Sequence, residues 1–283
     1  MKQRRFSRTA NKVAIRRAAH QLFDQPRVLD DPLAVPIIGV EAAEKLRSNP
    51  KERQHPISRA FRAFMAARSR YAEDQLAKAI EERVAQYVVL GAGLDTFAYR
   101  NPHAAYLQVF EVDHPATQAW KLERLQTAGI AIPTSLKFVP VDFERQTLAA
   151  GLAQSGFDSG SPAFFSWLGV TPYLTRESCI ATLRFIAQLP PGSGVAFDFA
   201  VDPKLLNLRQ RLALHAISRR VAAAGEPFQL FFRPTELAQE LRNMGFQRTE
   251  ILDTEEINAR YFKDRADGLR VRGGLGQLMG AWV

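Results

Sequence analysis

The sequence predicts an α/β protein: a doubly wound, mostly parallel seven-stranded sheet with an N-terminal helical extension and a helical lid. Between residues 84 and 202, short apolar runs alternate with helix-length segments, which is typical of parallel strands joined by right-handed crossovers. Several of these runs end at glycine or aspartate, as buried strands do where a turn begins. Two later apolar segments, 246–252 and 275–283, are expected to complete one edge of the sheet.

Three regions follow from this pattern. Residues 1–83 form a predicted helical cap packed on the core, and its longest helix covers 57–83. Residues 84–202 form the ligand-binding α/β core. Residues 203–283 supply a helical lid and the final strands of the same domain, because the regular alternation of strand and helix ends after Asp202.

The strongest local signal is the stretch Tyr-Val-Val-Leu-Gly-Ala-Gly-Leu-Asp-Thr at residues 87–96. A short apolar strand runs into Gly91-Ala92-Gly93, where two glycines allow a sharp turn and the close approach of a ligand. In doubly wound sheets ligands bind at the carboxyl ends of the strands. We therefore expect Gly91, Ala92, Gly93 and Asp95 to form the floor of a cofactor site, with a plain tight turn as the alternative.

The residues after this turn favour S-adenosylmethionine over a dinucleotide. A dinucleotide loop has a third glycine or alanine and opens a long helix against the pyrophosphate. Here the third position is Thr96, and Pro102 follows Asp95 by only seven residues. A carboxylate in the turn is a poor neighbour for a diphosphate, whereas it suits a methyl donor that is cationic and has no phosphate.

Two further carboxylates end predicted strands on the same side of the sheet. Asp113 ends the strand 105–113, twenty residues past Gly93, where a carboxylate can accept both hydroxyls of a ribose. Asp142 ends the strand 136–143, where it can accept the amino group of an adenine while Phe143 packs on the base. Each aspartate can instead cap the helix that follows it.

Arg68 falls on the apolar face of the long helix, whereas Arg70 points the opposite way. A guanidinium on a buried face needs an anion or several acceptors, because an isolated buried charge is very costly. Its partner is either a carboxylate of the protein or the carboxylate of a ligand such as the methionine part of the cofactor.

The net charge of +9 is concentrated at the N-terminus. Seven basic residues precede the first acid, Asp24, so the rest of the chain carries only +2. This basic arm is either a solvated segment or a contact for an anionic partner, and the nearly neutral body argues against a nucleic-acid-binding face.

The other composition signals concern the compartment and metal binding. Cys179 is the only cysteine, so no intramolecular disulfide is possible and a reducing compartment fits. No apolar run approaches the roughly 20 residues that a membrane helix needs, so we expect a cytoplasmic protein. Cysteine and histidine show no metal-ligand spacing, and no metal is expected.

Taken together, several motifs resemble those of the leucine carboxyl methyltransferase family, and more closely its bacterial branch of S-adenosylmethionine-dependent methyltransferases. One of them is the glycine turn with Tyr99-Arg100, and the motifs are specific as a set although each alone is weak. The resemblance covers nearly the whole chain and implies the Rossmann-like fold of class I methyltransferases. The other motifs are Asp30-Asp31-Pro32-Leu33-Ala34, Ala67-Arg68-Ser69-Arg70-Tyr71, Phe110-Glu111-Val112-Asp113, Val141-Asp142-Phe143 and Arg265-Ala266-Asp267-Gly268-Leu269.

The resemblance implies the same roles as the residues themselves: Arg68 for the carboxylate of the cofactor, Asp113 for its ribose, and Asp142 with Phe143 for its adenine. One position departs from the family pattern. Relatives often have a glutamate after the aromatic residue of the fourth strand, and this chain has Leu168. The analogy with protein carboxyl methyltransferases on the acceptor side is therefore in doubt.

The expected function is O-methylation of a carboxylate or hydroxyl on a small molecule. The sequence shows no clear general base and does not identify catalytic residues, the acceptor or the oligomeric state. Trp167 and Tyr173 are candidates for lining the acceptor pocket. The rival functions are a nicotinamide-dependent oxidoreductase, for which a Tyr-x-x-x-Lys or histidine pair is missing, and a nucleic-acid- or anion-binding protein that uses the basic arm.

Overall fold

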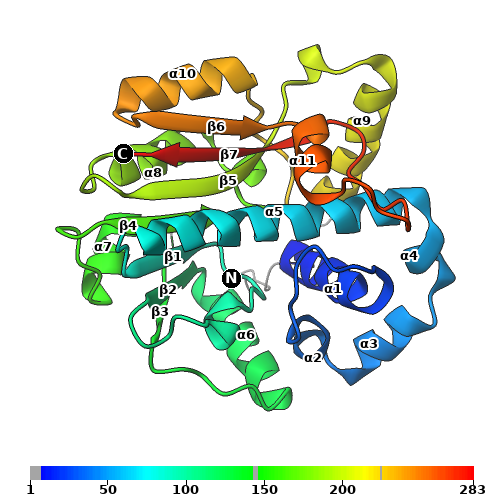
Figure 1. Ribbon diagram of the computed structural model, residues 1–283, viewed down its shortest axis with the longest axis horizontal. Helices are drawn as coiled ribbons and strands as arrows, with labels where there is room; N and C mark the ends of the chain where they lie inside the picture. The colour runs from blue at the N-terminus through cyan, green and yellow to red at the C-terminus, as the bar shows by residue number, and fades with distance from the viewer. Residues whose placement is uncertain (1–7, 143–145, 224) are drawn as a thin grey trace.

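The computed structural model describes residues 8–142, 146–223 and 225–283, which are organised around a seven-stranded sheet (Figure 1). The strand order is β3-β2-β1-β4-β5-β7-β6. Strands β1 to β5 are parallel, and β7 runs antiparallel to both of its neighbours. The predicted fold is thereby confirmed, with the last two strands at one edge. The strands are β1 (Gln86–Leu90), β2 (Gln108–Asp113), β3 (Leu136–Pro140), β4 (Ala163–Trp167), β5 (Gly194–Ala200), β6 (Arg248–Leu252) and β7 (Gly276–Trp282).

Strand β1 lies in the middle of the sheet, between β2 and β4, and all five of its residues are buried. Its side chains alternate, so that Val88 and Leu90 pack in one hydrophobic layer and Tyr87 and Val89 in the other. Such burial on both faces explains why the strand appears in the sequence as an uninterrupted apolar run. The strand order reverses between β1 and β4, which is the position where doubly wound sheets bind ligands.

Helices cover both faces of the sheet. The long helix α5 crosses one face, together with α11, while α7, α8 and α10 pack in the hydrophobic layer of the other (Figure 1). Within the described residues, no helix combines the length and the apolar character that a bilayer crossing requires. The helices of the core and of the C-terminal part are α5 (Pro56–Glu81), α6 (Pro115–Thr127), α7 (Leu148–Gln154), α8 (Arg176–Ala187), α9 (Leu208–Ala222), α10 (Pro234–Met244) and α11 (Thr254–Tyr261).

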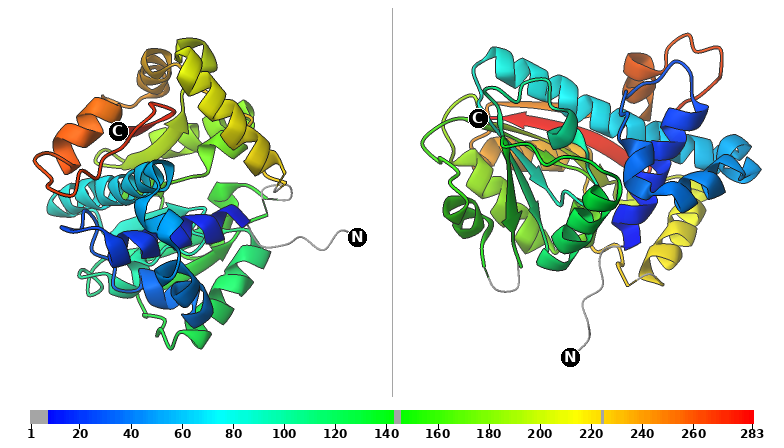
Figure 2. Two further views of the ribbon diagram at one scale, coloured as in Figure 1. Left: turned by 90° about the vertical axis from the view of Figure 1, so that its right-hand side faces the viewer. Right: turned by 90° about the horizontal axis from the view of Figure 1, so that it is seen from below.

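The N-terminal helices lie at the carboxyl ends of the parallel strands (Figure 2, right). They are α1 (Arg8–Phe23), α2 (Ala34–Ile38), α3 (Val40–Arg47) and α4 (Pro50–Gln54). Helices α1 to α3 share a third apolar cluster with α6. A buried ion pair joins α5 to the segment after α1, because Arg62 donates from Nε and Nη2 to the carboxylate of Asp24 at 3.0 and 2.8 Å. The proposed division into cap, core and lid stays a prediction.

Some element boundaries differ from those expected from the sequence. The predicted strand 105–113 begins at Gln108, because a turn closed by hydrogen bonds to the carbonyl of His103 occupies the residues before it. The predicted strand 136–143 ends at Pro140. The long helix begins at Pro56, where His55 caps it by accepting the N–H of Ile57 at 3.3 Å.

Candidate functional site

A cavity opens at the carboxyl ends of β1 and β4, where the strand order reverses. The glycine turn after β1 forms its floor, residues 9–17 of α1 form one wall, and residues 168–170 after β4 form another. The cavity brings together six of the predicted cofactor-binding residues and one of the two predicted acceptor-pocket residues. These residues are Arg68, Gly91, Ala92, Gly93, Asp95, Asp113 and Tyr173.

The glycines of the turn are required by their backbone and by their neighbours. Gly91 and Gly93 have φ values of +66° and +48°, a region in which residues with a side chain are strained. A Cβ on Gly91 would lie 2.4 Å from Cγ2 of Val170, and a Cβ on Gly93 would lie 3.0 Å from Cβ of Ala10. Two other segments therefore approach the turn as closely as a residue without a side chain allows.

Asp113 at the end of β2 reaches across to the glycine turn. Its Oδ2 accepts the N–H of Gly93 at 2.6 Å, and its Oδ1 accepts the N–H of His114 at 2.7 Å. Burial raises the pKa of Asp113, and these two donors offset that effect only in part. The alternative role, capping helix α6, belongs to His114 instead, whose Nδ1 accepts the N–H of Ala116 at 3.1 Å.

Arg68 lies at the cavity and pairs with a carboxylate of the protein. Its Nη1 is 2.9 Å from Oδ2 of Asp198 on β5, and both side chains are buried. The second oxygen of Asp198 accepts the N–H of Gly169, and a Cβ on Gly169 would lie 2.8 Å from the guanidinium. Among the described residues, the fully buried Nε of Arg68 has no hydrogen-bond partner. Of the two partners expected for Arg68, the structure shows the carboxylate of the protein. Arg68 also lines the cavity, and its contact with the carboxylate of a ligand stays a prediction.

Asp198 is a residue that the sequence reasoning missed. The available signal was an acid inside the otherwise apolar run Gly194-Val195-Ala196-Phe197-Asp198-Phe199. A buried strand has no room for an unpaired carboxylate, so the acid predicts a buried cation nearby. The identity of that cation comes from tertiary structure, because Arg68 is 130 residues away in the chain.

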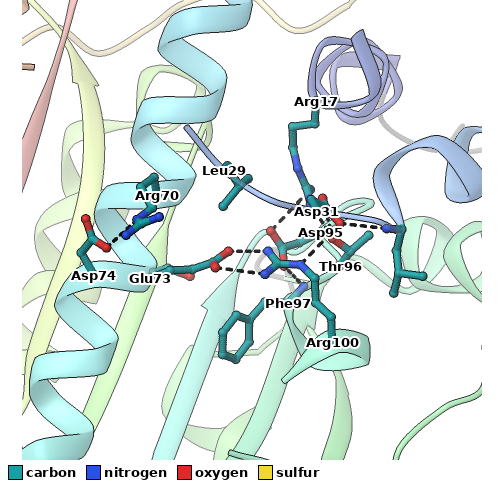
Figure 3. Close-up of polar contacts among 12 residues, drawn as sticks. Arg17, Leu29, Asp31, Arg70, Glu73, Asp74, Asp95, Thr96, Phe97 and Arg100 are labelled. Atoms are coloured by element: carbon teal, nitrogen blue, oxygen red, sulfur yellow. Dashed lines mark hydrogen bonds and ion pairs between the residues drawn. The ribbon is translucent and has the colours of Figure 1, made fainter. Parts of the chain in front are cut away.

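Beneath the glycine turn, a buried network of charges joins the cap to the core (Figure 3). Asp31 lies between Arg17 of α1 and Arg100, and it accepts the hydroxyl of Thr96 at 2.8 Å. Burial acts to raise the pKa of Asp31, but Arg17, Arg100 and the Thr96 hydroxyl outweigh it and hold the pKa below its ordinary value. Thr96, the residue that departs from a dinucleotide loop, thus serves to anchor the segment that follows α1.

Two other members complete this network. Asp95 Oδ2 lies 3.5 Å from Nη1 of Arg17, and its Oδ1 accepts the N–H of Phe97 at 2.8 Å. Arg100 also pairs with Glu73 of α5, whereas Arg70 points away and pairs with Asp74 (Figure 3). The cation beside Asp95 is therefore Arg17. Because the side chain of Arg17 is buried, Arg17 does not belong to the exposed part of the basic arm.

Trp167 does not line the cavity, and its expected acceptor role is corrected. Its side chain is buried in the layer that contains Phe165 and packs against Phe197 with a ring separation of 6.4 Å. The physical reason is the alternation along β4: Ser166 and Leu168 face the cavity, so the residue between them faces away. Tyr173 lies in the short helical turn after β4 and does line the cavity.

Asp142 and Phe143 are not brought into the cavity described here. Asp142 follows β3, directly beyond Val141, whose N–H donates to the carbonyl of Asp113 at 2.9 Å. It is therefore next to Asp113 at the edge of the sheet but outside the lining. Phe143 lies outside the described residues. Their role at an adenine stays a prediction.

Five polar residues in the lining were not foreseen from the sequence: Thr9, Arg17, Ser69, Ser166 and Glu226. Two of them, Thr9 of α1 and Glu226 of the turn after α9, contact each other. The carboxylate of Glu226 accepts hydrogen bonds from both the hydroxyl and the backbone N–H of Thr9. No local pattern marks either residue, because 217 residues separate them and only the folded chain brings them together.

The strand order, the antiparallel β7 and a glycine-floored cavity beside Asp113 define the fold as the Rossmann-like one of class I methyltransferases. Residues 10–187 match the sequence model of the family described as leucine carboxyl methyltransferase. The chain belongs to the leucine carboxyl methyltransferase family, and the expected class, an S-adenosylmethionine-dependent methyltransferase, is confirmed.

Two relatives and two solved structures illustrate this similarity. The chain is 33% identical to the putative S-adenosyl-L-methionine-dependent methyltransferase YktD of Bacillus subtilis over 95% of both chains. It is 35% identical to a putative S-adenosyl-L-methionine-dependent methyltransferase of Mycolicibacterium smegmatis, over 67% of this chain and 65% of that protein.

The solved structures agree in fold. A DUF574 family protein from Streptomyces avermitilis has a TM-score of 0.57 at 17% identity, covering 87% of this chain and 94% of that one. A putative methyltransferase from Thermobifida fusca has a TM-score of 0.55 at 15% identity, covering 95% and 93%.

Proposed function

We propose that this methyltransferase binds S-adenosylmethionine in the cavity at the ends of β1 and β4 and transfers the methyl group to an oxygen of a small molecule. The observation that carries the proposal is the grouping of the Gly91–Gly93 turn, Asp113 and Arg68 around one cavity at the point where the strand order reverses. Each of these groups suits one part of the methyl donor. The turn provides a floor, Asp113 can accept hydroxyl groups, and Arg68 is a cation that can bind a carboxylate.

The residues present fit this cofactor. The glycine turn lines the cavity with its backbone, and Ala10 and Val170 pack closely against its two glycines. The buried Nε of Arg68 has no partner within the described residues, so the guanidinium has donor capacity left for a carboxylate. We assign Arg68 to the carboxylate, the turn to the floor, Asp113 to the ribose hydroxyls, and Asp142 with Phe143 to the adenine.

Bound there, the cofactor supplies an electrophilic methyl group on a sulfonium. The task of the protein is to hold the acceptor oxygen about 3–3.5 Å from that methyl group and to exclude water, which together can supply roughly 7–11 kcal/mol. Helix α1 contributes Thr9 to the lining of the cavity, and the segment 203–233 contributes Glu226, which accepts hydrogen bonds from Thr9. We propose that these two elements form the lid over the acceptor.

The proposal is tested by thermal unfolding with S-adenosylhomocysteine and, in parallel, with NADH. A ligand at about 100 times its dissociation constant adds about 2.7 kcal/mol, which raises the midpoint by several degrees in a protein of this size. We expect a shift with S-adenosylhomocysteine alone, lost in Asp113→Ala and retained in the matched control Asp30→Ala, whose side chain is exposed. A shift with NADH alone would contradict the methyltransferase site.

The rival use of the basic arm is less well supported. Arg17 is buried in the network beneath the glycine turn, so the arm carries less exposed charge than the sequence suggested. Binding of a nucleic acid through this arm would be lost on removal of residues 1–17 and would fall steeply with salt. For the compartment, we infer a reducing one, since the single cysteine, Cys179, is buried and unpaired.

A further inference from the structure

A second cavity, of about 340 Å³, lies where the N-terminal end of α5 meets the loop between α11 and β7. Figure 1 shows this loop, coloured orange to red, beside that end of α5. Three arginines line the cavity: Arg59, Arg270 and Arg272. Arg59 lies nine residues before Arg68 on α5, about 14 Å along the helix axis, and the two cavities share no lining residue. The second cavity is therefore separate from the proposed cofactor site, and its volume is within the range of small-molecule sites.

Two of the arginines lie on a loop segment that α11 holds in place. Asn258 of α11 accepts the N–H of Val271 at 2.8 Å and donates from Nδ2 to the carbonyl of the same residue at 3.1 Å. Burial alternates along this segment, since Leu269 and Val271 are buried and Arg270 and Arg272 are exposed. This is the alternation of a strand with one buried face. It places both guanidinium groups on the side that lines the cavity.

Among the described residues of the lining, Asp267 is the only acid, and its carboxylate is already paired. Arg265 donates from Nε to Oδ1 at 2.9 Å and from Nη2 to Oδ2 at 2.7 Å. The N–H of Leu269 donates to Oδ1 at 3.0 Å. Burial acts to raise the pKa of Asp267, but Arg265 and the N–H of Leu269 outweigh it and hold the pKa below its ordinary value. Asp267 therefore shapes the loop, and Arg265 compensates its charge.

The three lining arginines keep most of their donors unused. Within the described part of the chain, the side chains of Arg270 and Arg272 have neither an ion pair nor a hydrogen bond. Arg59 donates from Nη2 to the backbone carbonyl of Asp267, which uses one of its five N–H groups. Helix α5 begins at Pro56 in the same lining, so the positive end of its dipole adds to the charge of the arginines. The cavity is thus strongly electropositive.

We propose that this second cavity binds a small phosphorylated compound that carries at least two negative charges. A planar guanidinium presents paired N–H donors that match the oxygens of a phosphate, which is why arginine is the usual residue for phosphate recognition. Three such groups around one cavity can contact one phosphate from several sides or two linked phosphates. This site goes beyond the proposed methyl transfer and does not depend on it.

The charge of the neighbouring segment favours a compact ligand over a nucleic acid. Residues 265–272 carry three arginines and one acid, whereas residues 253–264, which include α11, carry four acids and two bases. The positive charge of the loop therefore does not continue along α11. A nucleic acid binds to a basic stripe that follows its backbone, and α11 would repel such a backbone.

A simpler role for these arginines is solvation, because most arginines of a protein are exposed to water. Solvated arginines attract any anion weakly, and one exposed pair would then serve as well as another. The proposed site differs because Asn258 fixes the segment that carries Arg270 and Arg272. Binding to it should depend on which arginines are present and on how that segment is held.

Isothermal titration calorimetry with pyrophosphate at constant ionic strength separates the two roles. We expect the wild-type protein to bind pyrophosphate with a dissociation constant below about 1 mM. Arg270→Gln combined with Arg272→Gln should weaken binding about tenfold or more, since each lost guanidinium removes hydrogen bonds to a charged group. The matched control is Arg209→Gln combined with Arg211→Gln, which removes two exposed arginines of α9 and should leave the affinity within about twofold. An equal loss in both double variants would overturn the proposal.

Two further titrations test the geometry and the ligand class. Asn258→Ala keeps all three arginines but releases their segment, and we expect it to weaken pyrophosphate binding about threefold or more. Unchanged affinity in this variant would mean that the arginines act as loose surface charges, against the proposal. Succinate, a dicarboxylate, should bind about tenfold more weakly than pyrophosphate, and equal binding would overturn the phosphate class. If the wild-type protein does not bind pyrophosphate, the proposed site is wrong, whereas binding of S-adenosylhomocysteine in the other cavity is unaffected by that result.

Discussion

Arg68 on α5 and Asp198 on β5 form a buried ion pair, with Nη1 and Oδ2 2.9 Å apart, although 130 residues separate them in the chain. Asp198 also accepts the N–H of Gly169, so one carboxylate connects α5, β5 and the segment after β4. All three elements border the cavity or support it. The pair therefore sets the position of the guanidinium that we assign to the cofactor.

Replacing Arg68 should separate its structural role from its binding role. Arg68→Met leaves Asp198 buried without its cation, which we expect to cost about 3–5 kcal/mol in the free energy of unfolding by urea. Arg68→Met combined with Asp198→Asn removes both charges and keeps an acceptor for Gly169, so most of that loss should be recovered. Binding of S-adenosylhomocysteine should be weak in both proteins. Normal binding in the double variant would limit Arg68 to a structural role.

Gly91→Ala tests the close approach of Val170 to the glycine turn. The variant faces backbone strain at φ +66° and a Cβ 2.4 Å from Cγ2 of Val170. Gly129→Ala is its matched control, because Gly129 has φ +65° and no atom within 4 Å of the added Cβ. We expect a cost of about 1–2 kcal/mol in the control and about 1–3 kcal/mol more for Gly91→Ala, measured by urea unfolding.

A second substitution checks the cause of that difference. Val170→Ala in the Gly91→Ala protein removes the clashing methyl groups and should recover most of the extra loss, while the strain shared with Gly129→Ala remains. If Val170→Ala recovers nothing, the steric explanation for Gly91 is wrong.

The buried carboxylate Asp31 should make stability depend on pH in the acid range. Its folded-state pKa lies below the ordinary value of 3.8, so its contribution is complete above that value and is lost as the pH falls through the lower folded-state pKa. The difference in unfolding free energy between the wild-type protein and Asp31→Asn should therefore be large at pH 7 and should shrink steadily between pH 5 and pH 2.

The matched control for Asp31 is Asp30→Asn, since Asp30 is the exposed neighbour and pairs with Arg27 at the surface. Its effect should be below about 1 kcal/mol at every pH. A difference for Asp31→Asn that stays constant from pH 7 to pH 2 would show that the network of Arg17, Thr96 and Arg100 acts through shape and not through the charge of Asp31.

Trp167 should contribute to stability and not to ligand binding. Trp167→Ala removes a buried ring that packs on Phe197, and we expect it to cost about 3–5 kcal/mol of unfolding free energy. At a temperature where the variant is fully folded, its dissociation constant for S-adenosylhomocysteine should equal that of the wild-type protein. A weakened ligand at unchanged stability would contradict the placement of Trp167 in the core.

The general fold could be predicted from the sequence because its signals are local. Apolar runs such as Tyr87–Leu90 must be buried on both faces, and a run that ends at Gly91 must turn there. Asp113 could be assigned to the end of β2 for the same reason. The strand boundaries were less accurate, since the end of β3 at Pro140 depends on pairing with β2 and not on its own composition.

The site could be predicted only in part. The error at Trp167 came from treating an apolar aromatic residue near the end of a strand as pocket lining, without applying the alternation that points Ser166 and Leu168 to the cavity. Glu226 and Thr9 were missed because neither has a local signal.

By itself, the sequence determined the α/β class, the glycine turn, the strand-end carboxylates and the family, because each depends on residues close together in the chain. Only the tertiary structure decided which charges meet. Arg68 with Asp198, Arg17 with Asp31 beneath Thr96, and Thr9 with Glu226 are brought together by the packing of helices on the sheet. Ion pairs and hydrogen bonds act over a few ångströms, and the sequence records neither the distance nor the partner.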